Sequence, residues 1–199
     1  MGGGDKCLLP FGAKPILAHV IAALGPQTSA LLLSSNSDPA RFADFGLPVL
    51  ADAVPGFQGP LAGVLTGMLW CRRHHPHASH VLSVAADMPR LPADLATRMV
   101  QSLARDRADI VIASDSHRSH PVLGLWPVDL AERLDADLKQ TTIRSLHRWL
   151  SAFRVASCAF PQEAFLNINT REDLARGHRS SPGWGDRSVS DFTEKIGYF

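Results

Sequence analysis

Short, fully apolar runs alternate with amphipathic stretches along the first part of the chain, and this alternation is the feature that most restricts the fold. The run ALLL at residues 30–33 has no polar position, and the segment DIVIAS at 109–114 is apolar through its centre. A strand exposed on one face would alternate polar and apolar residues, whereas a strand covered on both faces need not. The pattern therefore predicts a parallel sheet covered by helices.

The stretches between these runs have the spacing of amphipathic helices. KPILAHVIAAL predicts a helix over residues 14–24 that ends at Gly25-Pro26, GPLAGVLTGMLW predicts a second helix, and a third starts at about Ala93. Strand and helix alternate in this way to about Ser114. The sequence therefore predicts an α/β fold of the Rossmann-like, three-layer kind with a mostly parallel sheet.

The second half of the chain is predicted to be of α+β character. HPVLGLW (120–126) has the composition of a strand, VDLAERLDADL and IRSLHRWL are amphipathic helices, and RVASCAF is an edge strand. Thr170 is a candidate helix N-cap. The chain length favours one domain, which we expect to span residues 1–176, followed by a disordered tail over 177–199 that is rich in Gly, Ser and charged residues.

Charge and cysteine usage exclude several classes of function. A formal net charge of +1 gives no broad field for nucleic acid or a membrane surface, and no apolar run approaches the roughly 18 residues of a membrane span. The three cysteines are widely spaced and form no CxxC pair, which favours reduced thiols in a cytoplasmic protein.

Two aspartates, Asp52 and Asp87, directly follow apolar strands. Ligands of open parallel sheets bind at the carboxyl ends of the strands, so both carboxylates are expected at one crevice. Magnesium is usually held by one or two carboxylates together with substrate phosphates and water, which predicts a nucleotide-metal site. The alternative is that each aspartate caps a turn or a following helix.

Three further motifs carry weaker predictions. QGPLAG (58–63) begins a helix whose amino terminus could receive an anion, or its glycines serve packing alone. GGGDK (2–6) is not a Walker loop, because no Ser or Thr follows the lysine. Cys71 and the histidines of CRRHHPHASH lack the spacing of a zinc site, and the basic residues there complement the dipole of a helix carboxyl end.

Five segments, taken in order, resemble the molybdenum cofactor guanylyltransferase family: MGGGDKCLLPFGAKPILAHVI, FQGPLAGV, VAADMPRLPADL, HPVLGLWP and FLNINTREDL. The resemblance covers residues 1–176. It implies an enzyme with a nucleotide-binding α/β fold that transfers GMP from GTP to molybdopterin, releasing pyrophosphate, with Mg²⁺ as cofactor. It also implies cofactor-synthesis or molybdoenzyme chaperone proteins as partners.

The resemblance assigns roles to individual residues. Lys6 matches the lysine that contacts the GTP phosphates, Asp52 the aspartate of the nucleotide pocket, and Asp87 the magnesium ligand. Asn36 is placed near the guanine, although the family's asparagine comes directly after the strand. Asn167 and Asn169 match paired asparagines on the substrate side, with helix capping as the alternative.

The segment that precedes Met-Gly-Gly in the family, a strand and a glycine-rich loop, has no counterpart here. We expect either a misplaced start or a shortened chain, and favour the former. Two alternatives to guanylyl transfer remain at this point: a sister enzyme that transfers CMP, and a shortened nucleotide-binding protein without turnover.

Overall fold

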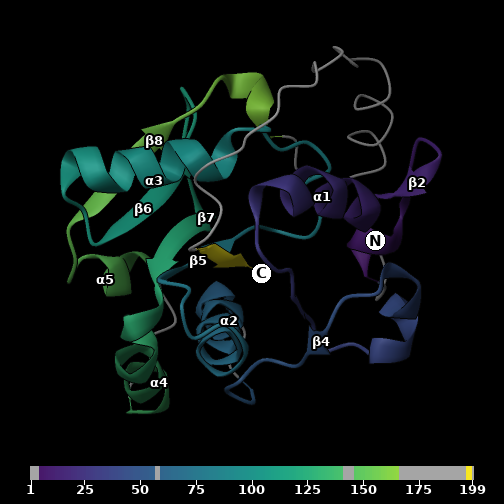
Figure 1. Cartoon of the computed structure of the whole chain (residues 1–199), viewed down its shortest axis with the longest axis horizontal. Helices are drawn as coiled ribbons and strands as arrows, with labels where there is room; N and C mark the ends of the chain where they lie inside the picture. The colour runs from purple at the N-terminus through teal and green to yellow at the C-terminus, as the bar shows by residue number, and fades with distance from the viewer. Residues whose placement is uncertain (1–4, 57–58, 141–145, 166–195, 199) are drawn as a thin grey trace.

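A five-stranded sheet lies at the centre of the computed structural model, which describes residues 5–56, 59–140, 146–165 and 196–198 (Figure 1). Within these residues the strand order is β8-β6-β7-β5-β9. Strand β6 is parallel to β8 and β5 is parallel to β9, whereas β7 runs antiparallel to both β5 and β6. The strands are β5 (His80–Ser83), β6 (Ile110–Ser114), β7 (Ser119–Pro127), β8 (Val155–Ala159) and β9 (Ile196–Tyr198).

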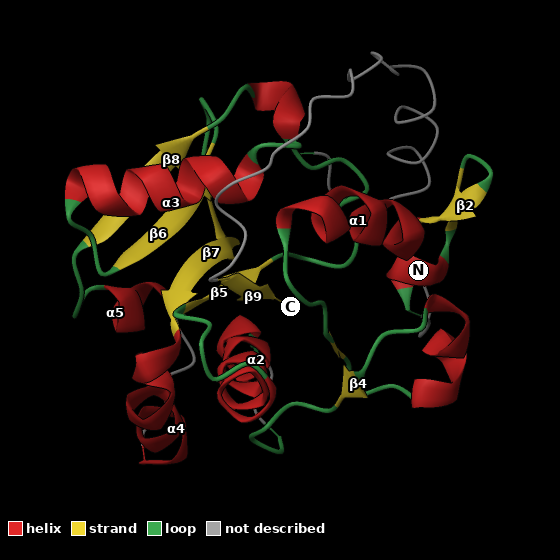
Figure 2. Cartoon of the chain, in the orientation of Figure 1, coloured by secondary structure: helices red, strands yellow, loops and turns green. Residues whose placement is uncertain are grey.

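Helices cover both faces of this sheet, so the predicted three-layer α/β fold is confirmed (Figure 2). The helices are α1 (Ile16–Leu24), α2 (Pro60–His74), α3 (Leu95–Asp106), α4 (Ala131–Gln140) and α5 (Leu146–Leu150). Helices α1 and α3 share one apolar core with Leu82 of the sheet, and α2, α4 and α5 share a second core with Val81. Neighbouring residues of one strand therefore enter different cores, as the alternation of side chains along a strand requires.

The second core is closed by a buried tryptophan that the sequence placed in a strand. The Trp126 side chain is 0% exposed, and its Nε1 donates a hydrogen bond to Ser83 Oγ at 2.8 Å. Its ring centroid lies 6.3 Å from that of Trp149 on α5. Both indoles are therefore packed in the core, since Trp149 is only 3% exposed.

A smaller part of the fold lies beside the main sheet. Strands β3 (Leu33–Ser34) and β4 (Val49–Leu50) form a separate parallel pair, and β1 (Pro10–Phe11) pairs with β2 (Lys14–Pro15) as a short hairpin. Among the described residues no ladder joins β3 and β4 to the main sheet. The short 3₁₀ helices are η1 (Lys6–Leu8), η2 (Gly25–Gln27), η3 (Pro39–Phe45), η4 (Val128–Leu130) and η5 (Gln162–Ala164).

Several predicted boundaries need correction. The strand expected to end at Asp87 stops at Ser83, because its ladder with β7 ends at Gly124 and the chain then turns, with Met88 N–H donating to the Ala85 carbonyl. The strand expected at residues 30–33 is reduced to Leu33–Ser34. The helix predicted from residue 14 begins at Ile16, since Lys14–Pro15 are paired as β2.

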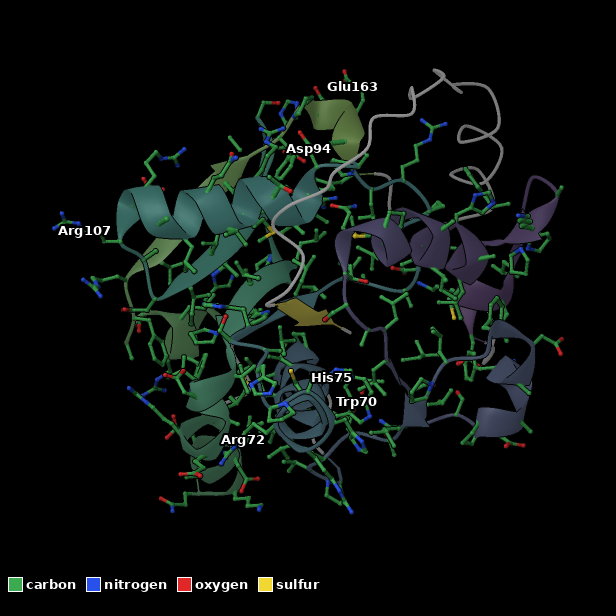
Figure 3. The ribbon with its side chains drawn as sticks, in the orientation of Figure 1. Trp70, Arg72, His75, Asp94, Arg107 and Glu163 are labelled. Carbon is green, nitrogen blue, oxygen red and sulfur yellow. The ribbon has the colours of Figure 1, made fainter. Side chains whose placement is uncertain are left out.

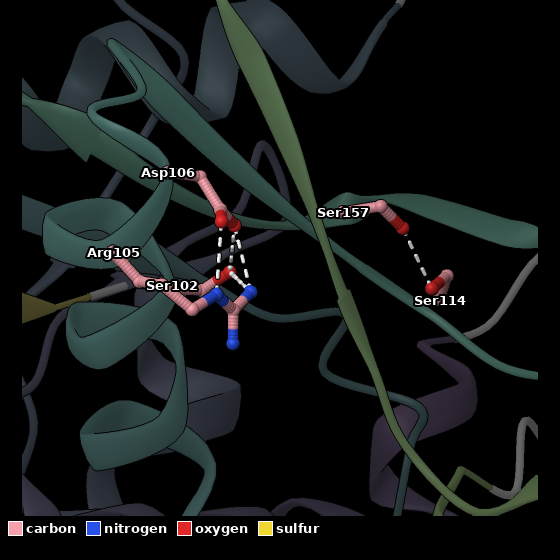
Figure 4. A network of polar contacts seen from close by, with 5 residues as sticks. All are labelled: Ser102, Arg105, Asp106, Ser114 and Ser157. Carbon is pink, nitrogen blue, oxygen red and sulfur yellow. Dashed lines mark hydrogen bonds and ion pairs between the residues drawn. The ribbon is translucent and has the colours of Figure 1, made fainter.

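Polar contacts reinforce the outer strand and the end of α3 (Figure 4). Ser157 Oγ donates to Ser114 Oγ at 2.7 Å across β8 and β6, and Arg105 pairs with the neighbouring Asp106. The prediction that residues 155–159 form an edge strand is confirmed, since β8 ends the strand order of the described sheet.

Part of the predicted organisation falls outside the described residues. The N-cap at Thr170 and residues 177–195 of the tail lie there, whereas Ile196–Tyr198, inside the segment expected to be disordered, form β9 beside β5. None of the helices in the described ranges has the length and apolar character needed to cross a membrane.

Candidate active site

Lys6 and Asp87 come together although they lie far apart in the sequence. Partial burial raises the pKa of Asp87 above its usual range, while a backbone hydrogen bond and the positive charge of Lys6 act to lower it. Lys6 is carried by η1, and Asp87 by the turn that follows β5. The two residues that the family resemblance matches to the phosphate and metal roles therefore lie close enough to interact electrostatically.

A small apolar cluster explains why these segments meet. Cys7, Leu33 and Phe42 are buried together, and Ala86 packs against them. Cys7, Leu33 and Ala86 directly adjoin Lys6, Ser34 and Asp87 in the sequence. Burying the cluster therefore brings these three polar residues to one region. Burial of the Cys7 thiol, together with the nearby Asp5 carboxylate, raises its pKa to about 11. Cys7 is thus a protonated packing residue at neutral pH.

Asp52 and Asn36 form a second polar group. Asn36 Nδ2 donates to Asp52 Oδ2 at 2.8 Å, and the Asn36 side-chain oxygen accepts from the Asp52 backbone N–H at 2.9 Å. Ser34 Oγ donates to the other carboxylate oxygen at 2.9 Å. The parallel pairing of β3 and β4 aligns the ends of these strands and so brings the three residues together.

Ser34 is a member of this group that the sequence did not identify. It ends strand β3, so its position at the carboxyl end of a strand was the available signal. Thr66 of α2 was also missed: its hydroxyl accepts from the Ala53 backbone N–H at 2.8 Å and donates to the Ala62 carbonyl. This contact fixes the residue after Asp52 to helix α2.

One cavity links the two polar groups. It has a volume of about 190 Å³ and lies among α1, β3, α2 and the end of β5. Ser34 lines it next to Asp52, Gly63 lines it from α2, and Ala86 lines it next to Asp87. A Cβ at Gly63 would lie 3.9 Å from Asp52 Oδ1, which is ordinary contact. The cavity is thus lined by Ser34, the hydrogen-bond partner of Asp52, and by Ala86, the sequence neighbour of Asp87, while the two aspartates themselves lie beside its lining.

The donor set fits a divalent cation held mainly by substrate. In the described part of the chain no three His, Cys, Asp or Glu side chains gather as a metal-binding group. Both oxygens of Asp52 accept hydrogen bonds, while the partly buried Asp87 carboxylate has a raised pKa that a bound cation would counteract. A single carboxylate completed by phosphates and water is a common magnesium arrangement.

The histidines at the carboxyl end of α2 make aromatic contacts in the region where Figure 3 labels Trp70 and His75. The His75 ring centroid lies 4.9 Å from that of Trp70, and the His74 centroid lies 5.4 Å from it. Arg72, labelled in the same region, pairs with Glu132 at 2.9 Å.

The remaining predicted site residues, Asn167 and Asn169, lie outside the described residues.

Comparison with known proteins gives the family. Residues 1–155 match the model of the MobA-like NTP transferase domain. The chain is 45% identical over 182 residues to the molybdenum cofactor guanylyltransferase of Bradyrhizobium sp. (strain ORS 278), covering 90% of this chain and 86% of that protein. The corresponding enzyme of Nitrobacter hamburgensis is 46% identical, with 90% and 87% covered.

Solved structures agree on the fold. A molybdopterin-guanine dinucleotide biosynthesis protein A from Archaeoglobus fulgidus superposes with a TM-score of 0.67 at 19% identity, covering 89% of this chain and 90% of that one. A Mycobacterium tuberculosis protein crystallised with manganese gives a TM-score of 0.65 at 16% identity, covering 89% and 94%. With its three-layer fold and its match over residues 1–155, this chain is a nucleotidyltransferase of the MobA-like NTP transferase family.

Proposed function

We propose that this chain transfers GMP from GTP to molybdopterin with release of pyrophosphate. The observation that carries the proposal is that Ser34, which hydrogen-bonds Asp52, and Ala86, which adjoins Asp87, line one cavity in a chain 45% identical to a molybdenum cofactor guanylyltransferase. The pairs concerned are Asn36–Asp52 and Lys6–Asp87. One pair suits a triphosphate and the other offers amide and carboxylate groups to a base. GTP and molybdopterin are the proposed substrates, and cofactor-synthesis or molybdoenzyme chaperone proteins the proposed partners.

In the proposed reaction a terminal phosphate oxygen of molybdopterin attacks the α-phosphorus of GTP. The new P–O bond forms as the α–β phosphoanhydride bond breaks, and pyrophosphate leaves with the bonding electrons. The attacking oxygen is already anionic, so no side chain has to remove a proton. The protein's task is to align two anions that repel each other and to balance the charge on the phosphoryl oxygens, which the Lys6 ammonium can do.

Asp87 is the proposed magnesium ligand. Bound Mg²⁺ would neutralise charge on the triphosphate and on the departing pyrophosphate. Asn167 and Asn169 are proposed to contact the substrate side of the site. A cytoplasmic location is also proposed, and the free, buried state of Cys7, Cys71 and Cys158 supports it.

The test is a turnover assay with molybdopterin, magnesium and either GTP or CTP, reading pyrophosphate and the dinucleotide product. We expect product with GTP and little with CTP. The variant Asp87→Asn should lose about a hundredfold in kcat, the usual cost of one electrostatic stabiliser. Its melting temperature should change little, because the burial that penalises the carboxylate charge outweighs the backbone hydrogen bond and the Lys6 charge that favour it.

Three results would count against the proposal. Preferred use of CTP would point to the CMP-transferring sister activity. Binding of magnesium-GTP by calorimetry without turnover would indicate a nucleotide-binding protein. Asp87→Asn activity within a few fold of wild type would reject Asp87 as the metal ligand.

A further inference from the structure

Asp5, which precedes Lys6, is tied to a segment far away in the sequence. Ser37 Oγ donates to Asp5 Oδ1 at 2.7 Å, and Arg41 forms an ion pair with Oδ2. The Asp5 side chain is 17% exposed, and its Oδ2 makes no hydrogen bond among the described residues, so the guanidinium is the counterion of that oxygen. Figure 1 shows the purple start of the chain beside the blue segment between β3 and β4.

The segment that receives Asp5 is itself well fixed. Asp38 caps η3 by accepting from the Ala40 backbone N–H at 3.0 Å, and Phe42 is 1% exposed in the cluster that contains Cys7. Ser37 directly follows Asn36, the residue that hydrogen-bonds Asp52. Asp5 is therefore anchored to a rigid part of the chain whose other end holds the Asn36–Asp52 pair.

Asp5 also connects this anchored segment to the turn that carries Lys6. The backbone of Asp5 precedes η1, and its carbonyl accepts from the Leu8 N–H at 3.0 Å. The backbone of Asp5 is thus bound to the η1 turn, while its side chain is bound to Ser37 and Arg41. Because Lys6 is the next residue, its stem leaves the protein from a fixed point.

We propose that Asp5, with Ser37 and Arg41, is a positioning group that sets Lys6 on the nucleotide phosphates while Asn36 and Asp52 hold the base. This inference rests on the proposed function. It assigns to the aspartate of GGGDK a role that neither its sequence context nor the family assignment supplies. Small misplacements of a substrate-contacting group are costly, so loosening Asp5 should weaken the contribution of Lys6 without removing its charge.

The test is a double-mutant cycle between Asp5→Asn and Lys6→Met, read as kcat/KM for GTP. If Asp5 acts through Lys6, Asp5→Asn should lower kcat/KM about tenfold in the wild-type background and less than about twofold when Lys6 is already Met. Equal losses in both backgrounds would mean that Asp5 serves stability or another contact, and no loss in the wild-type background would also overturn the proposal.

Two companion variants keep the test independent of a folding defect. Arg41→Lys retains the counterion and should recover most of the activity that Arg41→Gln loses. Asp109→Asn removes a similar aspartate–arginine pair, with Arg154 at 2.7 Å near the start of β6, and should leave kcat/KM for GTP unchanged. A loss from Asp109→Asn equal to that from Asp5→Asn would attribute the effect to general stability.

The positioning role can fail separately from the proposed function. If wild type binds magnesium-GTP without turnover, the function fails, and the same cycle is read on the Kd of magnesium-GTP with the same expected ratios. If wild type turns GTP over but the cycle is additive, the function stands and the positioning role of Asp5 falls.

Discussion

Replacing Gly124 with alanine should destabilise the protein through one buried side chain. Gly124 lies within β7, and a Cβ built there would come within 2.5 Å of Trp126 Cε2 and 2.7 Å of its Nε1. The indole has no room to move, because it is 0% exposed and hydrogen-bonded to Ser83. Forcing a methyl group into a packed core costs about 1–3 kcal/mol, and leaving a buried N–H without its acceptor costs about 1–3 kcal/mol.

These two costs partly overlap, so we expect the variant to lose about 3 kcal/mol of unfolding free energy. For a chain of this size each kcal/mol moves the melting temperature by about 2–4 °C, which gives a fall of about 6–12 °C. Thermal unfolding followed by calorimetry and by tryptophan fluorescence measures it directly.

Gly25→Ala is the matched control. Gly25 ends α1 with right-handed helical dihedral angles, φ −48° and ψ −48°, and a Cβ there would meet nothing within 4 Å. Alanine would restrict the unfolded chain, but Pro26 follows and its ring disfavours helical dihedral angles for a residue with a Cβ. These effects oppose each other, so we expect the control to change the melting temperature little. The packing argument is refuted if Gly124→Ala melts within about 2 °C of wild type, which is well below the shift expected from the Trp126 contact.

Three further predictions concern the site and its surroundings. Because burial raises the pKa of Cys7 to about 11, iodoacetamide at pH 8 should leave this thiol unmodified in the folded protein while labelling it in urea; rapid labelling of the native form, seen by mass spectrometry, would contradict this. Asp115 accepts from the backbone N–H of His117 and from the His120 ring, which lower its pKa to about 2. The charged Asp115 carboxylate therefore contributes its full stabilisation above the usual aspartate pKa, and this stabilisation is lost as pH falls through about 2. Asp115→Asn should flatten the dependence of melting temperature on pH between about 5 and 2. If the melting temperatures of wild type and variant fall in parallel over this range, Asp115 does not make this contribution. Asp52→Ala removes the acceptor of two side-chain hydrogen bonds and should raise KM for GTP about tenfold, equivalent to about 1.4 kcal/mol, whereas an unchanged KM would remove Asp52 from the nucleotide pocket.

Features that depend on local pattern were predictable from the sequence. The apolar run that became β6 and the spacing of the first three helices gave the layered fold, because buried strands and amphipathic helices have distinct periods. Asp52 and Asp87 were selected because strand ends in such sheets carry ligands. In the described residues the two aspartates follow strands of different sheets, so packing of the β3–β4 pair beside the main sheet, and not one continuous sheet edge, brings them to the same region.

Features that depend on tertiary proximity were not predictable. Nothing in the local sequence links Asp5 to Arg41, since their ion pair exists only once Cys7 and Phe42 share a core. Strand lengths were also overestimated near Asp87, because the end of β5 is set by where its partner β7 stops pairing and not by the apolar run itself. The pairing of Ile196–Tyr198 with β5 was likewise not predictable, because it depends on tertiary proximity. The polar, glycine-rich sequence around these residues has no strand pattern.

The division of the interior into two cores has a consequence for how the gene tolerates change. A substitution at Val81 or at Leu82 perturbs the packing on one side of the sheet only. Deleting a single codon within β5 or β6 would instead exchange the two sides for every later residue of that strand, placing side chains shaped for one core into the other. Length variation among natural versions of this enzyme should therefore be confined to the connections between strands and helices.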